Sequence, residues 1–247
     1  CTDARLEPVV KVFSDLPVPV VYTPGDNEWT DCRRERAGRW DPLERLERLR
    51  ARFFARPEVL RLDQLGPLLR PEGEEGRRFP EIYAFKRAGV LVVALHVVGS
   101  DNNFRRGDPA ALAEMARRDT TNLGFLMHMA ERAREQHLGA IVLLFQADPF
   151  FEREPSEGFA VIRAALVEMM TRYPGPVLLI HGDTHRFRYD RPLIDALSGK
   201  PSPRFQRAEV PGSPQVGGLW ISVDPDAAEP FAVEPVYPST PRDSGGD

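Results

Sequence analysis

The sequence lacks three features that would point to particular classes of protein. Its 247 residues contain no apolar run near the roughly 20 residues that span a bilayer, so we expect no membrane span. It has no large excess of one charge, because 33 Lys and Arg stand against 37 Asp and Glu, for a net charge of -4. That balance gives no sign of the basic surface that nucleic-acid-binding proteins carry.

Cysteine is also scarce, with only Cys1 and Cys32. They flank a predicted helix at 2–16 and a predicted strand at 18–22. If that strand returns the chain beside its start, the two residues can form a disulfide, which would indicate an exported or periplasmic protein. Two free thiols are the alternative, and they would fit a cytoplasmic protein.

What is present is ordinary for a globular protein, with 42% hydrophobic and 28% charged residues. The length suits one large α/β domain or two small ones, and no linker divides the chain. We therefore predict one domain at 1–238 and a tail at 239–247 whose composition is typical of disorder. The numbering begins without an initiator Met, so we expect a processed chain or a fragment.

Hydrophobic periodicity predicts strands alternating with helices, and hence an α/β fold. The pair Asp41-Pro42 starts a helix, with Asp as the N-cap and Pro at the first position. The expected strands lie at 18–22, 83–87, 90–98, 140–145 and 176–181; the expected helices lie at 2–16, from 42 onward, and at 109–136, 157–173 and 192–197; a closing antiparallel portion lies at 207–210, 218–223 and 231–236.

Three of these strands end in polar tips. The strand at 18–22 runs into Thr-Pro-Gly-Asp-Asn-Glu, the strand at 140–145 into Gln-Ala-Asp-Pro, and the strand at 176–181 into Gly-Asp-Thr-His. Sites in open α/β sheets form at the carboxyl ends of strands, so we predict that the tips converge. Since hard-cation ligand distances are about 2–2.6 Å, four side chains should lie within about 10 Å of one another. They are Asp26, Gln146, Asp183 and His185.

The third tip suits metal binding. Asp183 and His185 stand two apart, so in an extended turn both side chains can point the same way. Together they can grip a metal through a hard oxygen and an imidazole nitrogen. The alternative is a capped turn, with Asp183 bound to the backbone and His185 at the surface. We expect His181 to satisfy a backbone group rather than to bind metal.

The other two tips leave similar alternatives open. The Gly-Asp-Asn-Glu segment at 25–28 could be a plain Asx turn, although Glu28 and Trp29 add bulk that a turn does not need. Gln146 follows a buried strand directly, where an amide needs a partner. That partner could be a metal, a substrate oxygen or a neighbouring loop. The segment at 100–103 follows another strand and could line the same rim.

In order and spacing, these tips resemble the second half of a calcineurin-like metallophosphoesterase. That family has a Gly-Asn-His-Asp/Glu motif, then a His after an apolar strand, then a Gly-His-x-His motif. Here Gly-Asp-Asn-Glu at 25–28, Gln146 and Gly-Asp-Thr-His at 182–185 fall at those places, within a resemblance over about residues 1–190. The longer string at 22–32, Tyr-Thr-Pro-Gly-Asp-Asn-Glu-Trp-Thr-Asp-Cys, resembles a bacterial subgroup of the family.

The chain departs from the family pattern in several places. The family's first two motifs, Asp-x-His and Gly-Asp, would precede this sequence, so we expect an amino-terminally truncated protein. Asp26 replaces a ligand Asn, and Gln146 and Asp183 replace ligand His residues. Only His185 keeps the family's residue. The remaining ligand set is rich in oxygen, which favours Mg, Mn or Ca over Zn.

The resemblance implies a fold and a function. The fold is a two-sheet α/β/β/α sandwich of the metallophosphoesterase type with its first part missing. The function is hydrolysis of a phosphate-ester substrate at a two-metal site, with Mn or Mg as the cofactor. Its ligands would be Asp26, Gln146, Asp183 and His185. Asn27 replaces a His that resembles a general acid; it would orient phosphate oxygens, and Glu28 joins it among the expected catalytic residues.

Two other functions stay open. The His replacements favour a non-catalytic relative, a binding protein that kept the fold and lost the metal. The chain could instead be an unrelated doubly wound α/β domain that binds a small polar ligand at its switch point. A single parallel sheet would favour that third interpretation over two packed sheets.

Overall fold

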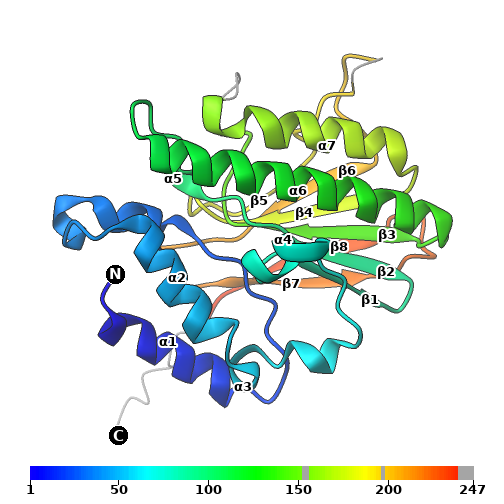
Figure 1. Ribbon diagram of the computed structural model, residues 1–247. Coiled ribbons are helices and arrows are strands. Elements are labelled where there is room, and N and C mark those ends of the chain that lie inside the picture. The colour runs from blue at the N-terminus through cyan, green and yellow to red at the C-terminus, as the bar shows by residue number, and fades with distance from the viewer. Residues whose placement is uncertain (152–155, 196–197, 239–247) are drawn as a thin grey trace, which may run out of the picture.

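The computed structural model describes residues 1–151, 156–195 and 198–238, and its centre is a mixed sheet (Figure 1). The six strands of that sheet follow the order β1-β2-β3-β4-β6-β5. β2, β3, β4 and β6 run parallel, while β1 and β5 pair antiparallel at the edges. β7 and β8 form a separate antiparallel pair. The strands are β1 (Tyr83–Arg87), β2 (Val90–Ala94), β3 (Ala140–Leu144), β4 (Val177–His181), β5 (Arg188–Asp190), β6 (Phe205–Glu209), β7 (Gly218–Val223) and β8 (Phe231–Val236).

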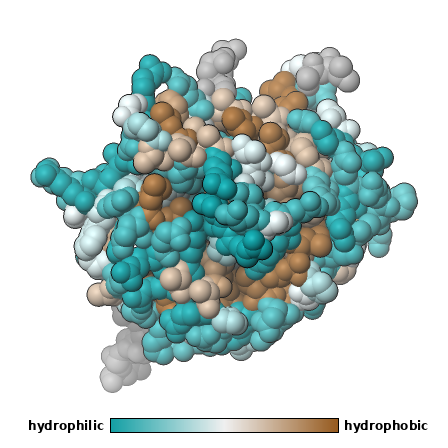
Figure 2. All heavy atoms as spheres, in the orientation of Figure 1, coloured by the Kyte–Doolittle hydropathy of each residue, from teal (hydrophilic) through white to brown (hydrophobic). Residues whose placement is uncertain are grey.

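Helices cover one face of the six-stranded sheet. The two long helices α6 and α7 lie side by side across it, whereas β7 and β8 lie on its opposite face and α1 to α3 to one side (Figure 1). On the face seen in Figure 2, hydrophilic residues cover most of the surface and apolar residues show in separate patches. The helices are α1 (Asp3–Asp15), α2 (Pro42–Phe53), α3 (Pro57–Leu60), α4 (Gly73–Arg78), α5 (Gly99–Asn102), α6 (Pro109–Glu135) and α7 (Ala160–Arg172).

Alternation along the central strands builds two cores. In β3, Ile141 and Leu143 pack under the helices, while Val142 packs toward β7 and β8. In β4, Leu179 packs under the helices and Leu178 packs toward β7 and β8. Because both faces of these strands are buried, they are continuous apolar runs in the sequence, which is why their positions could be predicted.

The predicted α/β class is confirmed. The sheet is mixed and a second sheet packs on it, so the described residues do not form the single parallel sheet of the doubly wound alternative. On the outer side of β7, Trp220 is 68% exposed, so no helix in the described part of the chain covers that point. The metallophosphoesterase type of sandwich stays a prediction. No described helix is long and apolar enough to span a bilayer, as expected.

The strand predicted at 18–22 is wrong. The segment begins with a bend at 17–18 and has no regular secondary structure after it, and among the described residues it joins neither sheet. The Val20 N–H donates to the Leu60 carbonyl at 2.8 Å, and the Tyr22 N–H donates to the Tyr83 hydroxyl at 3.0 Å. Prolines at 17 and 19 remove two donors on the same side of the segment, so it cannot support a regular ladder there.

Two further predictions need correction. The helix predicted at 192–197 is absent over its described residues, 192–195, where Ile194 instead forms an antiparallel bridge with Pro201. The segment at 207–210 does not form one antiparallel portion with β7 and β8, because β6 lies inside the main sheet, where it pairs parallel with β4 and antiparallel with β5. All five β6 residues are buried, but Gln206, Arg207 and Glu209 hide that burial from a hydropathy pattern. The tail predicted at 239–247 lies outside the described residues.

The predicted disulfide is present. Cys1 and Cys32 are bonded with a Cα–Cα distance of 5.5 Å, within the usual range, so the alternative of two free thiols is wrong. The route differs from the prediction, because α1 packs against α2 through Leu6, Val10 and Leu49 rather than through a returning strand. A disulfide fits an exported protein.

Candidate functional site

Three of the four side chains predicted to converge lie together at one edge of the sheet. Gln146 follows β3 and Asp183 follows β4, and these strands are parallel neighbours. Asp26 reaches them from the start of a short 3₁₀ turn, Asp26–Glu28, that follows the irregular segment at 18–25. The Gln146 Nε2 group donates to Asp26 Oδ1 at 3.2 Å and to Asp183 Oδ1 at 3.5 Å. We call Asp26 and Asp183 the carboxylate pair.

Gly99 covers the carboxylate pair. A Cβ atom on Gly99 would lie 2.7 Å from both Asp26 Oδ2 and Asp183 Oδ1, so both oxygens lie against Gly99. Only glycine leaves room for them. The Gly99 N–H donates to Gln146 Oε1 at 2.6 Å, which orients the amide with its nitrogen toward the carboxylates.

The carboxylate pair lies in an environment that favours a cation. Burial raises the pKa of Asp26, and the charge of Asp31 raises it further. Burial also raises the pKa of Asp183; a hydrogen bond from the Asp148 N–H opposes this, and the charge of Asp26 adds to it. No Lys or Arg charge is among the main causes that shift the pKa of either carboxyl. A bound cation would stabilise both carboxylates.

His185 does not join the contacts of the carboxylate pair. Its exposed imidazole lies against Gly212, and its Nδ1–H donates to the Ser213 carbonyl at 2.9 Å. The φ angles of Asp183 and His185 are 82° and 64°, so the segment is not extended and the side chains need not share one direction. The Nε2 atom of His185 keeps a lone pair available for a ligand.

The two predicted catalytic residues differ in their surroundings. Asn27 is exposed beside Asp26. Glu28 turns back into its own loop, where its Oε2 accepts a hydrogen bond from the Gly25 N–H at 2.9 Å. Burial raises the pKa of Glu28. Glu28 therefore braces the loop that carries Asp26.

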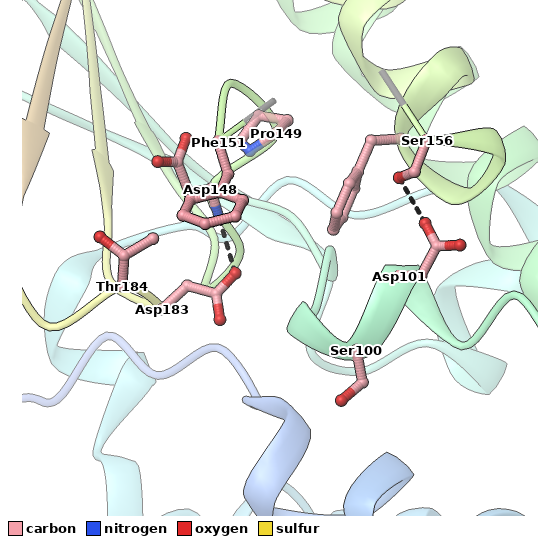
Figure 3. A pocket seen from close by; sticks show the side chains of 9 residues that line it. Ser100, Asp101, Asp148, Pro149, Phe151, Ser156, Asp183 and Thr184 are labelled. Carbon is pink, nitrogen blue, oxygen red and sulfur yellow. Dashed lines mark hydrogen bonds between the residues drawn. The ribbon is translucent and has the colours of Figure 1, made fainter. Parts of the chain in front are cut away.

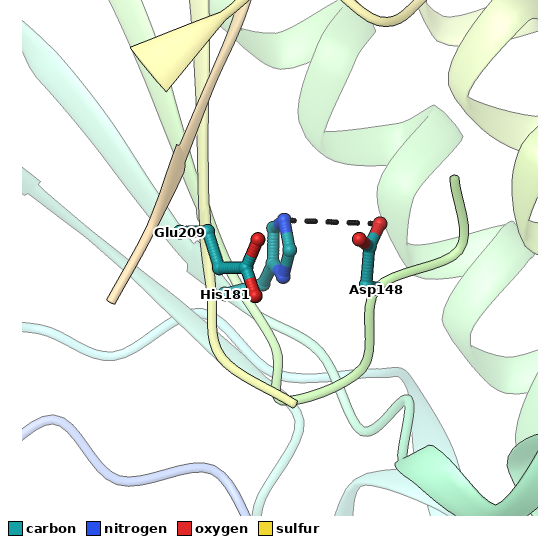
Figure 4. Close-up of side chains that lie close together, drawn as sticks. All are labelled: Asp148, His181 and Glu209. Carbon is teal, nitrogen blue, oxygen red and sulfur yellow. Dashed lines mark ion pairs between the residues drawn. The ribbon is translucent and has the colours of Figure 1, made fainter. Parts of the chain in front are cut away.

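A second group, of two acidic residues and a histidine, lies deeper at the same end of the sheet. The sequence alone did not predict that these three residues come together. Asp148, His181 and Glu209 are buried, with one ligand atom of each within 4.8 Å of the others (Figure 4). This group, which we call the buried triad, could hold a metal ion. Asp148 stood in a predicted tip, but Glu209 could be added only once β6 was known to pair with β4.

His181 has its free nitrogen in the buried triad. Its Nδ1–H donates to the Gly182 carbonyl at 2.8 Å, so the expectation that it satisfies a backbone group is confirmed. Because a carbonyl only accepts, Nε2 carries the lone pair, and it has no hydrogen-bond partner in the described part of the chain. Burial lowers the pKa of His181, which keeps the ring neutral near pH 7.

Arginine already offsets much of the triad's charge. Arg207 Nη1 lies 3.0 Å from Asp148 Oδ1, and Arg188 Nη1 lies 3.3 Å from Asp148 Oδ2. Arg188 Nε also lies 3.3 Å from Glu209 Oε2. The carboxylate pair has no such guanidinium among the described residues, so it has the greater electrostatic need of a cation.

Residues 100–103, which include α5 except for its first residue Gly99, form a left-handed turn. The φ angles of Ser100, Asp101, Asn102 and Asn103 are 53°, 55°, 52° and 64°. A left-handed Ser costs about 1–2 kcal/mol, whereas Asp and Asn adopt this conformation more readily. Such conformations persist only where surrounding contacts enforce them, and they gather at functional sites.

A buried arginine enforces this turn. Arg118 of α6 is fully buried and donates to the carbonyls of Asn102 and His96, each at 2.9 Å. It also pairs with Glu114 at 2.6 Å. On the other side, Asp101 Oδ1 accepts a hydrogen bond from the Gly158 N–H at 3.1 Å.

A cavity of about 600 Å³ adjoins the site, a size typical of small-molecule sites. Figure 3 shows Asp148, Asp183 and Thr184 on one side of it and Ser100, Asp101 and Ser156 on the other. The remaining lining residues are Pro149, Phe151 and Phe159.

Comparison with known proteins gives this chain no family. No protein-family model matches it. Among curated proteins, too, no match is found.

Proposed function

We propose that the protein hydrolyses phosphate esters with divalent metal ions bound at the carboxylate pair. The observation that carries this proposal is that Gln146 Nε2 lies 3.2 Å from Asp26 Oδ1 and 3.5 Å from Asp183 Oδ1, which brings the two carboxylates together. Two half-buried carboxylates held close to each other are suited to a hard cation. The adjoining cavity has room for a substrate.

The donor set favours Mn or Mg, which accept carboxylate ligands, and the exposed Nε2 of His185 is available as a nitrogen ligand. When bound, such ions polarise phosphoryl oxygens and activate water. The residues of the chain supply the rest. Gln146 holds the two carboxylates together. The exposed amide of Asn27 can donate hydrogen bonds to phosphate oxygens.

One observation favours the non-catalytic alternative. The nitrogen of Gln146, rather than its oxygen, faces the carboxylate pair, and its two N–H groups take part of the place of a cation. A protein that relied on this amide alone would keep the cavity and bind a ligand without hydrolysing it. Metal content decides between the two functions.

The test measures Mn²⁺ binding by calorimetry and turnover of a generic phosphate ester after metal depletion and add-back. It should use the longest form of the protein that its gene encodes. We expect Asp26→Asn and Asp183→Asn to lose both Mn²⁺ binding and turnover. Glu209→Gln tells the two candidate metal sites apart, because it changes the buried triad and leaves the carboxylate pair intact; we expect it to keep Mn²⁺ binding and turnover. A wild-type protein that binds no Mn²⁺ and shows only background turnover would refute the proposal.

A further inference from the structure

We infer that Ser100 is a positioning residue of the proposed metal site, held against Asp26 by the left-handed turn at 100–103. The inference rests on the proposed function, because it assigns a role toward the metal ligand Asp26. It concerns how the ligand oxygen is oriented before a cation arrives.

The Ser100 hydroxyl contacts the ligand oxygen itself. Ser100 Oγ lies 3.3 Å from Asp26 Oδ2, the oxygen that lies against Gly99. The same hydroxyl lies 2.5 Å from Asp31 Oδ1. The hydroxyl has one proton and can donate to one carboxylate at a time, but its oxygen lies between Asp26 and Asp31 and limits rotation of the Asp26 carboxylate.

Arg34 fixes the other end of this link. Its Nη2 donates to Ser100 Oγ at 3.0 Å, and its Nη1 pairs with Asp31 Oδ2 at 2.6 Å. The hydroxyl therefore accepts from a cation while facing two carboxylates, which leaves its proton directed at the acidic side. Ser100 is thus fixed by three partners, and Asp26 is oriented through it.

The backbone explains why the hydroxyl can reach this place. Ser100 and the three residues after it are all left-handed, a conformation that glycine would adopt at far lower cost. Arg118 and Asp101 secure the turn from two sides. A glycine at position 100 would have no backbone strain. The serine has that strain but contributes a hydroxyl that contacts the two carboxylates.

The experiment compares Ser100→Gly with Ser100→Ala. Both remove the hydroxyl, but only Gly also relieves the backbone. We expect both to weaken Mn²⁺ binding about 10- to 100-fold, as removal of groups that orient metal ligands does. We expect Ser100→Gly to melt about 2–4 °C above Ser100→Ala, the shift typical of one strained residue in a domain of this size.

Ala88→Gly is the matched control. Ala88 also has a positive φ, 47°. It lies in the turn between β1 and β2, at the end of the sheet opposite the carboxylate pair. Its replacement should raise the melting temperature similarly and leave Mn²⁺ binding unchanged.

The outcomes separate the two proposals. If the wild-type protein binds Mn²⁺ and the Ser100 variants bind it equally well, the inference is wrong and the proposed function stands. Weakened binding in Ser100→Ala alone would also overturn it, since the hydroxyl is absent from both variants. Equal melting temperatures of the two Ser100 variants would contradict the strain on which it rests. A wild-type protein that binds no Mn²⁺ overturns both proposals.

Discussion

Replacing Arg118 with Met should cost the fold about 3–5 kcal/mol, the usual loss when one partner of a buried ion pair is removed. Arg118 is fully buried, and the side chain of its partner Glu114 is only 11% exposed. Burial by itself would raise the pKa of Glu114, but the Arg118 charge and hydrogen bonds lower it. Without Arg118, Glu114 would be left as an unpaired buried charge, and the Asn102 carbonyl that fixes the left-handed turn would lose its donor.

The neighbouring residue provides the control. Arg117 also pairs with a glutamate, Glu75, but the Arg117 side chain is 48% exposed. Exposed pairs contribute about 0–1 kcal/mol, so Arg117→Met should barely change stability. Urea unfolding followed by circular dichroism measures both variants against the wild type. Adding Glu114→Gln to Arg118→Met should recover part of the loss, because the second change removes the unpaired charge.

The same measurements can refute this reasoning. If Arg118→Met costs no more than Arg117→Met, the buried network does not stabilise the fold. Suppose that Glu114→Gln lowers the free energy of unfolding as much in Arg118→Met as it does in the wild type. The two residues are then not coupled. Either result would mean that the Arg118–Glu114 pair does not enforce the left-handed turn.

Two further predictions concern the supports of the fold. Burial would raise the pKa of Glu81, but the His96 hydrogen bond and Arg50 lower it to about 2, below its usual 4.5. About 3 kcal/mol of stability should therefore be present above pH 4.5 and disappear as pH falls toward 2, and acid unfolding of Glu81→Gln should lack this loss. Reducing Cys1–Cys32, which are 31 residues apart, should cost about 4 kcal/mol by loop entropy, and an unchanged urea midpoint after reduction would contradict this.

The parts of the site that rest on the central sheet could be predicted from the sequence. Gln146 and Asp183 each follow an apolar run, and parallel neighbours end at one edge, so their meeting followed from the pattern. Glu209 could not be placed, because polar residues in β6 masked a buried central strand. The turn at 100–103 was also invisible as a left-handed turn. Its conformation depends on Arg118, whose contacts with the turn arise only from tertiary packing.

The two halves of the carboxylate pair are therefore held by different means. Asp183 is fixed by the sheet, through β4 and the Asp148 N–H. Asp26 arrives on a loop outside both sheets, and local links hold it: the Glu28 carboxylate on Gly25, the Ser100 hydroxyl and, six residues on, the buried disulfide at Cys32. Local opening follows the weakest supports. Loss of the disulfide should thus disturb the Asp26 half of the site before the Asp183 half, and metal binding before the fold.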